Sequence, residues 1–318
     1  MQRALRRAGH TTLLFDDRRW KRHIGWRWTQ RMALRAAERF RPDFVFLSKC
    51  LALYPETVAA IVRDRPNAMW YHDPHSYRGV ASGQSAHVLS IARLSQTFYV
   101  TGFAAEWRAL GLPAKFLPAA GDASIVPVAP QSRYACDVAF IGSADDGPRA
   151  EFIMRLAERV PLHVWGPGWD SRRSRFAGGG SFIKGRAFAA ACASAKVMLG
   201  IHAVDPVAEA SADGYTSDRT WMVFLAGACY VASGTTGLGR LVRDGEHCAL
   251  YDDADSCVEL VRHYVADADG RARLRTQAEQ FARNYHTYDQ RIATLLAGSE
   301  WANPLLYSDS AVSPMSNP

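Results

Sequence analysis

The sequence lacks several features that would assign it to a familiar class. No apolar run approaches the roughly 18 residues of a membrane-spanning helix, which excludes a helical integral membrane protein. The N-terminus is rich in arginine from Arg3 onward and has no apolar h-region, so no secretory signal is expected. The six cysteines include no C-x-x-C pair. We therefore expect reduced thiols in the core of a cytoplasmic protein.

The overall composition is ordinary. The chain has 318 residues, a length that predicts about two domains. Apolar residues make up 48% and charged residues 22%, which is typical of a soluble globular protein and excludes a disordered, collagen-like or fibrous chain.

The net charge of +7 is concentrated in one segment. Residues 1–41 contain 12 lysines and arginines and 3 acidic residues, whereas the remainder contains 26 basic and 28 acidic residues. Trp20, Trp26 and Trp28 lie among these basic residues. Three interpretations are open: a solvated helix face with packed tryptophans, peripheral docking to the anionic inner face of a membrane, and nucleic-acid binding. The absence of a nucleic-acid motif disfavours the third.

Short apolar runs alternate with helical stretches along the chain. In the first half, strands are expected at 11–15, 43–47, 68–71, 97–100 and 115–117, with helices at 29–40, 55–63, 86–94 and 104–110. Residues 119–134 carry Pro, Gly, Ala and Ser without a period and resemble a linker. In the second half, strands are expected at 136–141, 162–165, 196–201, 229–232 and 249–251. Helices are expected there at 149–159, 186–194, 217–226, 237–243, 254–266, 268–285 and 288–297.

Strand–helix–strand order at this spacing predicts parallel strands with right-handed crossovers and helices on both sheet faces. We therefore predict an α/β protein with two tandem Rossmann-like doubly wound domains. The N-terminal domain is placed at 1–121, a linker at 122–134, the C-terminal domain at 135–298 and a tail at 299–318. The first residues already resemble a helix leading into a second strand, so the first domain is expected to lack its opening strand.

In open parallel sheets, ligands bind beyond the carboxyl ends of the strands. Gly142 and Ser143 follow the strand at 136–141 and precede a helix, whose N-terminus favours a phosphate. Gly168 and Trp169 follow the strand at 162–165, where an aromatic ring is placed to stack on a base. The structural alternatives are ordinary turns and a packed tryptophan.

Further polar residues follow the later strands. His202 comes after the strand at 196–201, and Arg219 and Thr220 open the helix at 217–226. An arginine there suits a bidentate contact with a diphosphate, and a surface salt bridge is the alternative.

The loop at 233–237 leads directly into a helix. Thr235, Thr236 and Gly237 supply hydroxyl and N–H groups that suit a phosphate, with a flexible turn as the alternative. The loop contains no Gly-Lys-Ser/Thr sequence, which excludes a Walker A site.

In the first half, His72 and Asp73 follow the strand at 68–71. An imidazole and a carboxylate at a strand end suit a general base or the orientation of a substrate hydroxyl. A structural Asp-Pro turn is the alternative, and no third ligand cluster supports a metal site.

Five motifs of the second half occur in a familiar order: DVAFIGS at 137–143, VWGPGW at 164–169, SDRTWMVFLAGA at 217–228, TTGLGRLVRDGEHCALYDD at 235–253 and YHTYDQR at 285–291. Through them the chain resembles the C-terminal domain of GT-B glycosyltransferases, most closely the CgeB-like group of glycosyltransferase family 4-like proteins. In the first half the resemblance rests on AGHTTLLFDD at 8–17, PDFVFLSK at 42–49 and the His-Asp-Pro turn.

This resemblance implies a metal-independent, hexosyltransferase-type enzyme that moves a sugar from a nucleotide-diphosphate sugar to an acceptor hydroxyl in an interdomain cleft. The donor is a substrate, and no cofactor is implied. The resemblance also implies a role for each residue above. Gly142, Ser143 and the 233–237 loop would face the diphosphate, and Gly168 and Trp169 would flank the base. Arg219 and Thr220 would lie at the sugar–phosphate end of the donor, and His72 and Asp73 would face the acceptor. Inverting and retaining transfer are both open.

One position departs from the family pattern. Met222 stands where these enzymes usually have a glutamate that binds the ribose hydroxyls. The alternative function is therefore a catalytically weak or inactive GT-B-like protein that binds a nucleotide sugar or a partner.

Overall fold

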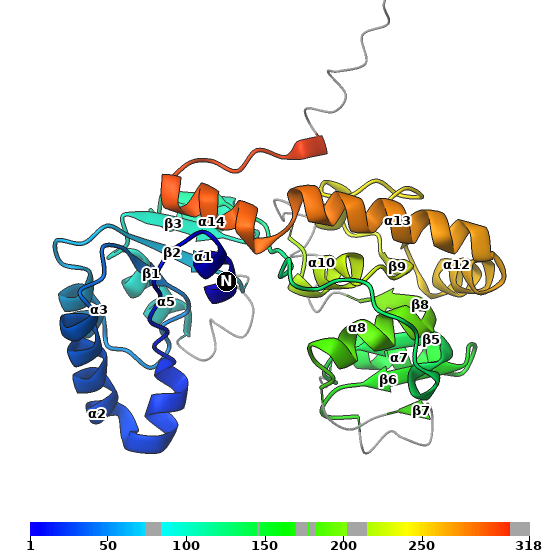
Figure 1. The fold of residues 1–318 in the computed structure, drawn as a ribbon, viewed down its shortest axis with the longest axis horizontal. Helices are drawn as coiled ribbons and strands as arrows, with labels where there is room; N and C mark the ends of the chain where they lie inside the picture. The colour runs from blue at the N-terminus through cyan, green and yellow to red at the C-terminus, as the bar shows by residue number, and fades with distance from the viewer. Residues whose placement is uncertain (74–83, 145–146, 170–176, 179–181, 202–214, 306–318) are drawn as a thin grey trace, which may run out of the picture. The chain divides into compact units, whose positions relative to one another are not determined.

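The computed structural model describes residues 1–73, 84–144, 147–169, 177–178, 182–201 and 215–305. The chain forms two compact units (Figure 1). Unit 1 contains Met1–Ala119, Tyr215 and Asp289–Ala302, and unit 2 contains the other described residues.

Unit 1 is built on a four-stranded parallel sheet with the strand order β1-β2-β3-β4. The strands are β1 (Val45–Leu47), β2 (Asn67–Tyr71), β3 (Thr97–Val100) and β4 (Ala114–Phe116). They are connected by the helices α3 (Pro55–Val62), α5 (Gln84–Ala92) and α6 (Ala104–Ala109). Because sheet neighbours are also consecutive in the chain, right-handed crossovers place these three helices on one face of the sheet.

The two faces of this sheet have different coverings, because alternate strand residues point to opposite sides. Met69 and Phe98 are fully buried in the main core of the unit. Trp70 and Tyr99 are partners in the β2–β3 register and are also fully buried. The Tyr99 hydroxyl donates a hydrogen bond to the Ser299 carbonyl at 2.8 Å. The second face is therefore covered by the chain around α14 (Tyr288–Ala297).

Arg291 attaches α14 to unit 1. Its guanidinium is fully buried and donates from Nε to the Pro118 carbonyl at 2.8 Å and from Nη2 to the Ala119 carbonyl at 3.4 Å. Such contacts offset the desolvation of a buried guanidinium. The units therefore differ from the contiguous domains expected from the sequence: residues 289–298 belong to unit 1, and the expected linker at 122–134 belongs to unit 2. Of the expected tail, residues 306–318 lie outside the described residues.

The strand expected at 11–15 is wrong. After α1 (Gln2–Arg7) the chain has no regular structure there, and the side chains of Leu13 and Leu14 are 51% and 67% exposed. A strand needs a hydrogen-bonded neighbour, and within the described residues β1 pairs with β2 alone. The residues of this segment predict a strand, but in the structure the segment does not pair with the open edge of β1.

Helix α2 (Asp17–Phe40) begins twelve residues before the helix expected at residue 29. The Asp16 carboxylate caps it by accepting a hydrogen bond from the Arg19 N–H at 3.0 Å. At Gly25 the backbone leaves the helical conformation, with φ 75° and ψ 174°, so that the helix is sharply kinked. No helix of the described residues is long and apolar enough to cross a membrane.

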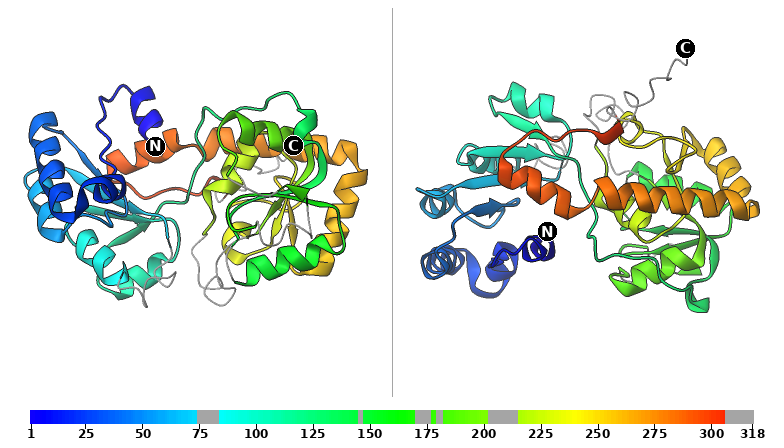
Figure 2. Two further views of the ribbon diagram at one scale, coloured as in Figure 1. Left: turned by 90° about the horizontal axis from the view of Figure 1, so that it is seen from below. Right: turned by 45° about the horizontal axis from the view of Figure 1, so that its top comes forward.

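Unit 2 contains a six-stranded parallel sheet with the order β10-β9-β8-β5-β6-β7. Its strands are β5 (Cys136–Ile141), β6 (Leu162–Trp165), β7 (Ala177–Gly178), β8 (Ala195–Gly200), β9 (Tyr230–Ser233) and β10 (Ala249–Tyr251). Its helices are α7 (Pro148–Ala157), α8 (Arg186–Ser194), α10 (Asp218–Leu225), α11 (Thr236–Gly239), α12 (Ala254–Ala266) and α13 (Ala268–Tyr285). Figure 2 shows that helices lie on both faces of this sheet. The strand order reverses between β5 and β8, so that their carboxyl ends form the switch point of a doubly wound sheet.

All six cysteines are free thiols, as the sequence predicts. Burial raises the pKa of Cys50, Cys229 and Cys257 to about 12 and that of Cys136 to about 11. These thiols are protonated at neutral pH and act as small apolar groups.

The pH dependence of stability is expected to depend on His247. Its buried ring stacks on Phe281 with centroids 3.9 Å apart, and its Nδ1 accepts a hydrogen bond from the Arg243 N–H at 3.0 Å. Burial lowers the pKa of His247 below its ordinary value of 6.5, an effect that Glu246 opposes. The unfolded chain therefore binds the proton more readily, so this contribution to stability is complete above about pH 6.5 and is lost as the pH falls below it.

We predict that the urea midpoint of unfolding falls between pH 8 and pH 5.5, and falls less in His247→Asn. The asparagine amide oxygen can still accept the Arg243 N–H but does not titrate. Equal pH dependence in the two proteins would exclude His247 as the responsible group.

Candidate functional site

The candidate site in unit 2 begins at the switch point of its sheet. Gly142 and Ser143 directly follow β5, whose neighbours are β6 and β8. Gly142 is buried and Ser143 is half-buried. A β-carbon added at Gly142 would lie 2.8 Å from Nη2 of Arg219. The structure therefore brings together two of the predicted site residues, Gly142 and Arg219.

The loop after β6 is held against the loop after β5 by backbone contacts. The Gly142 N–H donates to the Trp165 carbonyl, and the Ala144 N–H donates to the Pro167 carbonyl, both at 2.9 Å. Gly166 has φ 149°, and a β-carbon there would overlap the Gly142 carbonyl oxygen. Glycine is therefore required at 166 by both the backbone conformation and the close approach of the two loops.

Trp169 has a different position from the one expected of a base-stacking ring. It is fully buried and lies edge-on to Phe140, and its indole N–H donates to the Gly142 carbonyl at 2.7 Å. A ring enclosed in the core offers no face to a ligand, so the predicted stacking on a base is wrong. Its contact fixes the backbone of Gly142. Gly168, with φ 84°, permits the turn that brings Trp169 inward.

Arg219 lies at the start of α10. The Ser217 hydroxyl caps this helix by accepting the Arg219 N–H at 3.2 Å. The Arg219 guanidinium carbon is 5.0 Å from the Phe140 ring centroid, close enough for a cation–π contact. The partial positive charge of the helix N-terminus and the charge of the guanidinium thus both lie beside Gly142.

Thr220 is fully buried and accepts a hydrogen bond from the Thr216 hydroxyl at 3.0 Å. It also interacts with the phenol of Tyr230, a fully buried side chain whose pKa is raised by burial and lowered by Arg219. These contacts hold α10 on the sheet. The Thr220 side chain thus serves the packing of α10, and the expected place of Thr220 at the sugar–phosphate end of a donor stays a prediction.

Arg149 was not identified from the sequence. It is the second residue of α7, and its Nη2 donates to the Ser143 carbonyl at 2.9 Å. Arg149 thereby places a second guanidinium at the loop after β5. One feature of the sequence could have identified it: Arg149 stands at the start of the helix that follows the Gly142-Ser143 turn.

The loop after β9 supplies exposed and capping groups. The Thr235 hydroxyl caps α11 by accepting the Leu238 N–H at 3.2 Å, and Gly237 is buried. Thr236 and Gly234 are exposed. Of the three predicted phosphate-binding residues here, Thr236 is therefore the one whose side chain remains open to solvent. His202 lies outside the described residues.

Met222 is partly exposed on α10, three residues after Arg219 and four after Asp218. This spacing places the three residues on one side of the helix. The Asp218 Oδ1 atom is buried and makes no hydrogen bond within the described part of the chain.

The second candidate site lies in unit 1 at the carboxyl ends of β1 and β2. The Lys49 ammonium contacts the Asp73 carboxylate at 2.5 Å, and both side chains are partly exposed. The His72 carbonyl accepts a hydrogen bond from the Thr101 hydroxyl at 2.9 Å, and the His72 ring lies against Trp70. The structure thus places His72 and Asp73 at an edge where charged and polar groups from three strands meet.

Lys49 and its neighbour Cys50 both have left-handed backbones, with φ 56° and 49°. Such conformations strain residues other than glycine and are concentrated at functional sites. Lys49 was not identified from the sequence, because a lysine two residues beyond a strand carries no signal of this geometry.

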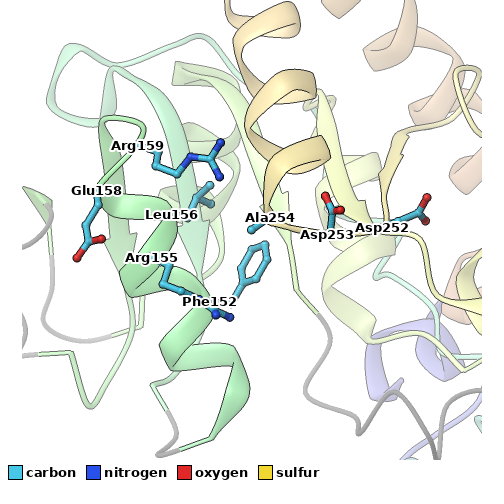
Figure 3. Close-up of a pocket in the computed structure, with 8 residues that line it drawn as sticks. All are labelled: Phe152, Arg155, Leu156, Glu158, Arg159, Asp252, Asp253 and Ala254. Carbon is cyan, nitrogen blue, oxygen red and sulfur yellow. The ribbon is translucent and has the colours of Figure 1, made fainter.

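A surface pocket of about 570 Å³ lies elsewhere in unit 2, between α7 and the start of α12 (Figure 3). Phe152 and Arg155 line it from α7 and Arg159 from the turn that follows α7, with Asp252 and Asp253 on the opposite side. It contains none of the predicted site residues. Among the described residues no group of three or more His, Cys, Asp and Glu side chains is placed to hold a metal ion.

Comparison with known proteins agrees with this architecture. Residues 149–297 match a family model described as glycosyl transferase-like. No curated protein sequence matches the chain. The structure of Anabaena HepE in complex with UDP and glucose is 13% identical, with a TM-score of 0.62 over 85% of this chain and 81% of that chain.

Two further structures are similar. Sucrose-phosphate synthase from Thermosynechococcus elongatus is 12% identical, with a TM-score of 0.60 over 90% of this chain and 79% of that chain. An alpha-glucosyltransferase in complex with UDP and DNA is 9% identical, with a TM-score of 0.63 over 85% of this chain and 83% of that chain. The chain therefore has the GT-B fold, and the predicted pair of Rossmann-like α/β domains is confirmed.

Proposed function

We propose that this GT-B protein is a glycosyltransferase that moves a hexose from a nucleotide-diphosphate sugar to an acceptor hydroxyl. The observation that supports this most strongly is the contact of Arg219 with Gly142 at the switch point of unit 2. The glycosyl transferase-like match covers α10, and several similar structures contain UDP or a UDP-sugar. We place the protein in the CgeB-like group and, because all its cysteines are free, in the cytoplasm.

The proposed donor site contains positively charged side chains of unit 2 that can bind the diphosphate. Arg219 and Arg149 bring two guanidinium groups to the loop after β5, and Ser143 and Thr236 add partly or fully exposed hydroxyls. Guanidinium groups bind phosphate oxygens through paired N–H donors. When the bond between the anomeric carbon and the diphosphate oxygen breaks, the nucleoside diphosphate leaves with the electron pair. These fixed donors stabilise the developing negative charge, and we propose that the reaction needs no metal ion.

The acceptor side is assigned to His72 and Asp73 of unit 1. In an inverting reaction the acceptor oxygen forms the new bond to the anomeric carbon, and its proton passes to Asp73 or His72. Lys49 orients the Asp73 carboxylate through their contact. In a retaining reaction the same groups would hold the acceptor and would take no proton from it.

Thermal-shift measurements with UDP-, GDP- and dTDP-linked hexoses test the proposed function. A ligand that binds only the folded state stabilises it, so at least one donor is expected to raise Tm by several degrees at a concentration far above its Kd. Release of the free nucleoside diphosphate from the donor that binds would establish catalysis.

Met222 favours a second candidate, a catalytically weak or inactive protein that binds the same donors. A thioether accepts hydrogen bonds weakly, so a ribose contact made by glutamate would be lost. Binding of a donor without release of nucleoside diphosphate in the presence of candidate acceptors would favour this candidate.

Met222→Glu is expected to tighten donor binding about tenfold, since a hydrogen bond to a charged group contributes about 1.5–3 kcal/mol. Titration calorimetry with the donor measures this, and Met222→Leu, which adds no acceptor, serves as the matched control. Unchanged or weaker affinity of the glutamate variant would show that the ribose is bound elsewhere, with Asp218 as the next position to replace.

A further inference from the structure

Unit 1 exposes large apolar side chains within a short stretch of its N-terminal segment. The exposed fractions are 51% for Leu13, 67% for Leu14, 36% for Trp20, 40% for Trp26 and 52% for Trp28. Exposed apolar side chains that are close together mark interaction surfaces, whereas single ones do not.

The same stretch is strongly basic. Between residues 16 and 31 it contains the basic side chains Arg18, Arg19, Lys21, Arg22, Arg27 and Arg31. Its two carboxylates are engaged by backbone N–H groups: Asp16 accepts from Arg19 at 3.0 Å, and Asp17 accepts from Ala52 at 2.7 Å. The acidic groups thus serve the local fold, while the arginines at 18, 19, 22, 27 and 31 are exposed. We call residues 13–31 the basic–aromatic corner.

The kink at Gly25 shapes this corner. The two parts of α2 meet there and form a bend at the edge of unit 1 (Figure 1). The second part is fastened to the unit by Gln30, whose side chain donates to the Ala52 carbonyl at 2.8 Å and accepts from the Tyr54 N–H at 2.9 Å. Because Thr29, Gln30 and Ala33 form the buried side, the exposed side is not required for packing within the unit.

Cations cover the faces of two of the tryptophan rings. The Lys21 ammonium lies 3.9 Å from the Trp26 ring centroid, and the Arg31 guanidinium lies 4.9 Å from that of Trp28. Trp26 also stacks on Tyr54, with centroids 5.8 Å apart. These contacts occupy ring faces that a single-stranded nucleic acid would need for base stacking.

We propose that the basic–aromatic corner docks unit 1 on the surface of an anionic lipid bilayer. Tryptophan rings are favoured at the level of lipid headgroups, and lysine and arginine are attracted to lipid phosphates. The aliphatic side chains of Leu13 and Leu14 can enter the boundary between headgroups and acyl chains. A surface that bound only phosphate groups would not need them. Charge and apolar groups thus occur together, as peripheral membrane binding requires. This inference does not depend on the sugar donor or on catalysis.

Co-sedimentation of the full chain with vesicles tests the proposal. The protein is expected to bind vesicles of phosphatidylcholine containing phosphatidylglycerol, to bind pure phosphatidylcholine at least tenfold more weakly, and to dissociate as salt is raised. Arg19→Glu with Arg22→Glu should weaken binding to the anionic vesicles by about tenfold or more, because each basic residue near such a surface contributes about 1 kcal/mol. The matched control is Arg63→Glu with Arg93→Glu, which reverses two exposed charges of unit 1 outside the corner and should leave binding within about twofold.

A second pair of variants separates lipid from nucleic acid. Leu13→Asn with Leu14→Asn should also weaken vesicle binding by about tenfold while leaving the unfolding midpoint unchanged, since both side chains are exposed. The proposal is overturned if anionic vesicles are not bound, or if both arginine pairs weaken binding equally. It is also overturned if the leucine pair has no effect while the protein binds single-stranded RNA in an Arg19- and Arg22-dependent way.

Discussion

Arg219→Ala is expected to weaken the binding of a nucleotide-diphosphate sugar by about two orders of magnitude. The guanidinium lies beside Gly142 at the switch point and at the N-terminus of α10, where it can pair with the oxygens of a diphosphate. Hydrogen bonds to charged groups contribute about 1.5–3 kcal/mol, which corresponds to a factor of roughly 10 to 150 in affinity. Titration calorimetry or thermal shift with the donor that binds the wild type measures the change.

Two variants make the Arg219 result specific. Arg219→Lys keeps the charge but loses the paired N–H donors, so it should fall between the wild type and Arg219→Ala. Arg262→Ala removes an exposed arginine of α12 and should leave affinity unchanged. If Arg219→Ala binds the donor as tightly as the wild type, Arg219 has no part in the site.

Gly166→Ala is expected to destabilise unit 2 by at least about 3 kcal/mol, because it combines backbone strain with a steric overlap. At φ 149° residues other than glycine are disfavoured, and the added methyl group would meet the Gly142 carbonyl oxygen. The loops after β5 and β6 would then be forced apart, and the Trp169 contact with Gly142 would be strained. Urea denaturation followed by far-UV circular dichroism measures the loss.

Two control glycines separate the causes of this loss. Gly239→Ala has no positive φ and no atom within 4 Å of the new β-carbon, so its stability should change by no more than about 0.5 kcal/mol. Gly245→Ala, at φ 69° with the same open space, tests backbone strain alone and should cost about 1 kcal/mol. A Gly166→Ala protein as stable as Gly245→Ala would show that the two loops do not depend on their close approach.

Five of the six strands of unit 2 could be predicted from the sequence, whereas the two-residue strand β7 was not predicted. The strands at 136–141, 162–165 and 249–251 have the bounds expected from the sequence, as does the strand at 97–100 in unit 1. Each is a short, mainly apolar or aromatic run between turn residues, as expected of strands that are covered on both sheet faces. The helices at 254–266, 268–285 and 288–297 were equally clear, because Asp253 and Asp267 cap the first two and Tyr288 opens the third after a turn.

Features that depend on distant partners were not predictable. Residues 11–15 have a strand-like sequence, but whether they form a strand depends on a neighbour that no local pattern specifies. The assignment of α14 to unit 1 depends on the burial of Arg291 against the carbonyl groups of residues 118 and 119. The sequence left Trp169 open between a base-stacking ring and a packed one, because the direction of the ring is set by the Gly142 carbonyl and Phe140. Lys49 became a candidate only through its left-handed backbone and its contact with Asp73.

Amide hydrogen exchange with and without a saturating nucleotide sugar tests the central claim most directly, since it locates the bound donor without requiring an acceptor. With whichever of the UDP-, GDP- or dTDP-linked hexoses raises Tm most, peptides covering residues 142–144, 217–220 and 233–237 should gain protection, and those covering α12 and the pocket near Phe152 should not. Protection confined to other segments, or no protection with any of the three donors, would contradict a donor site at the switch point of unit 2.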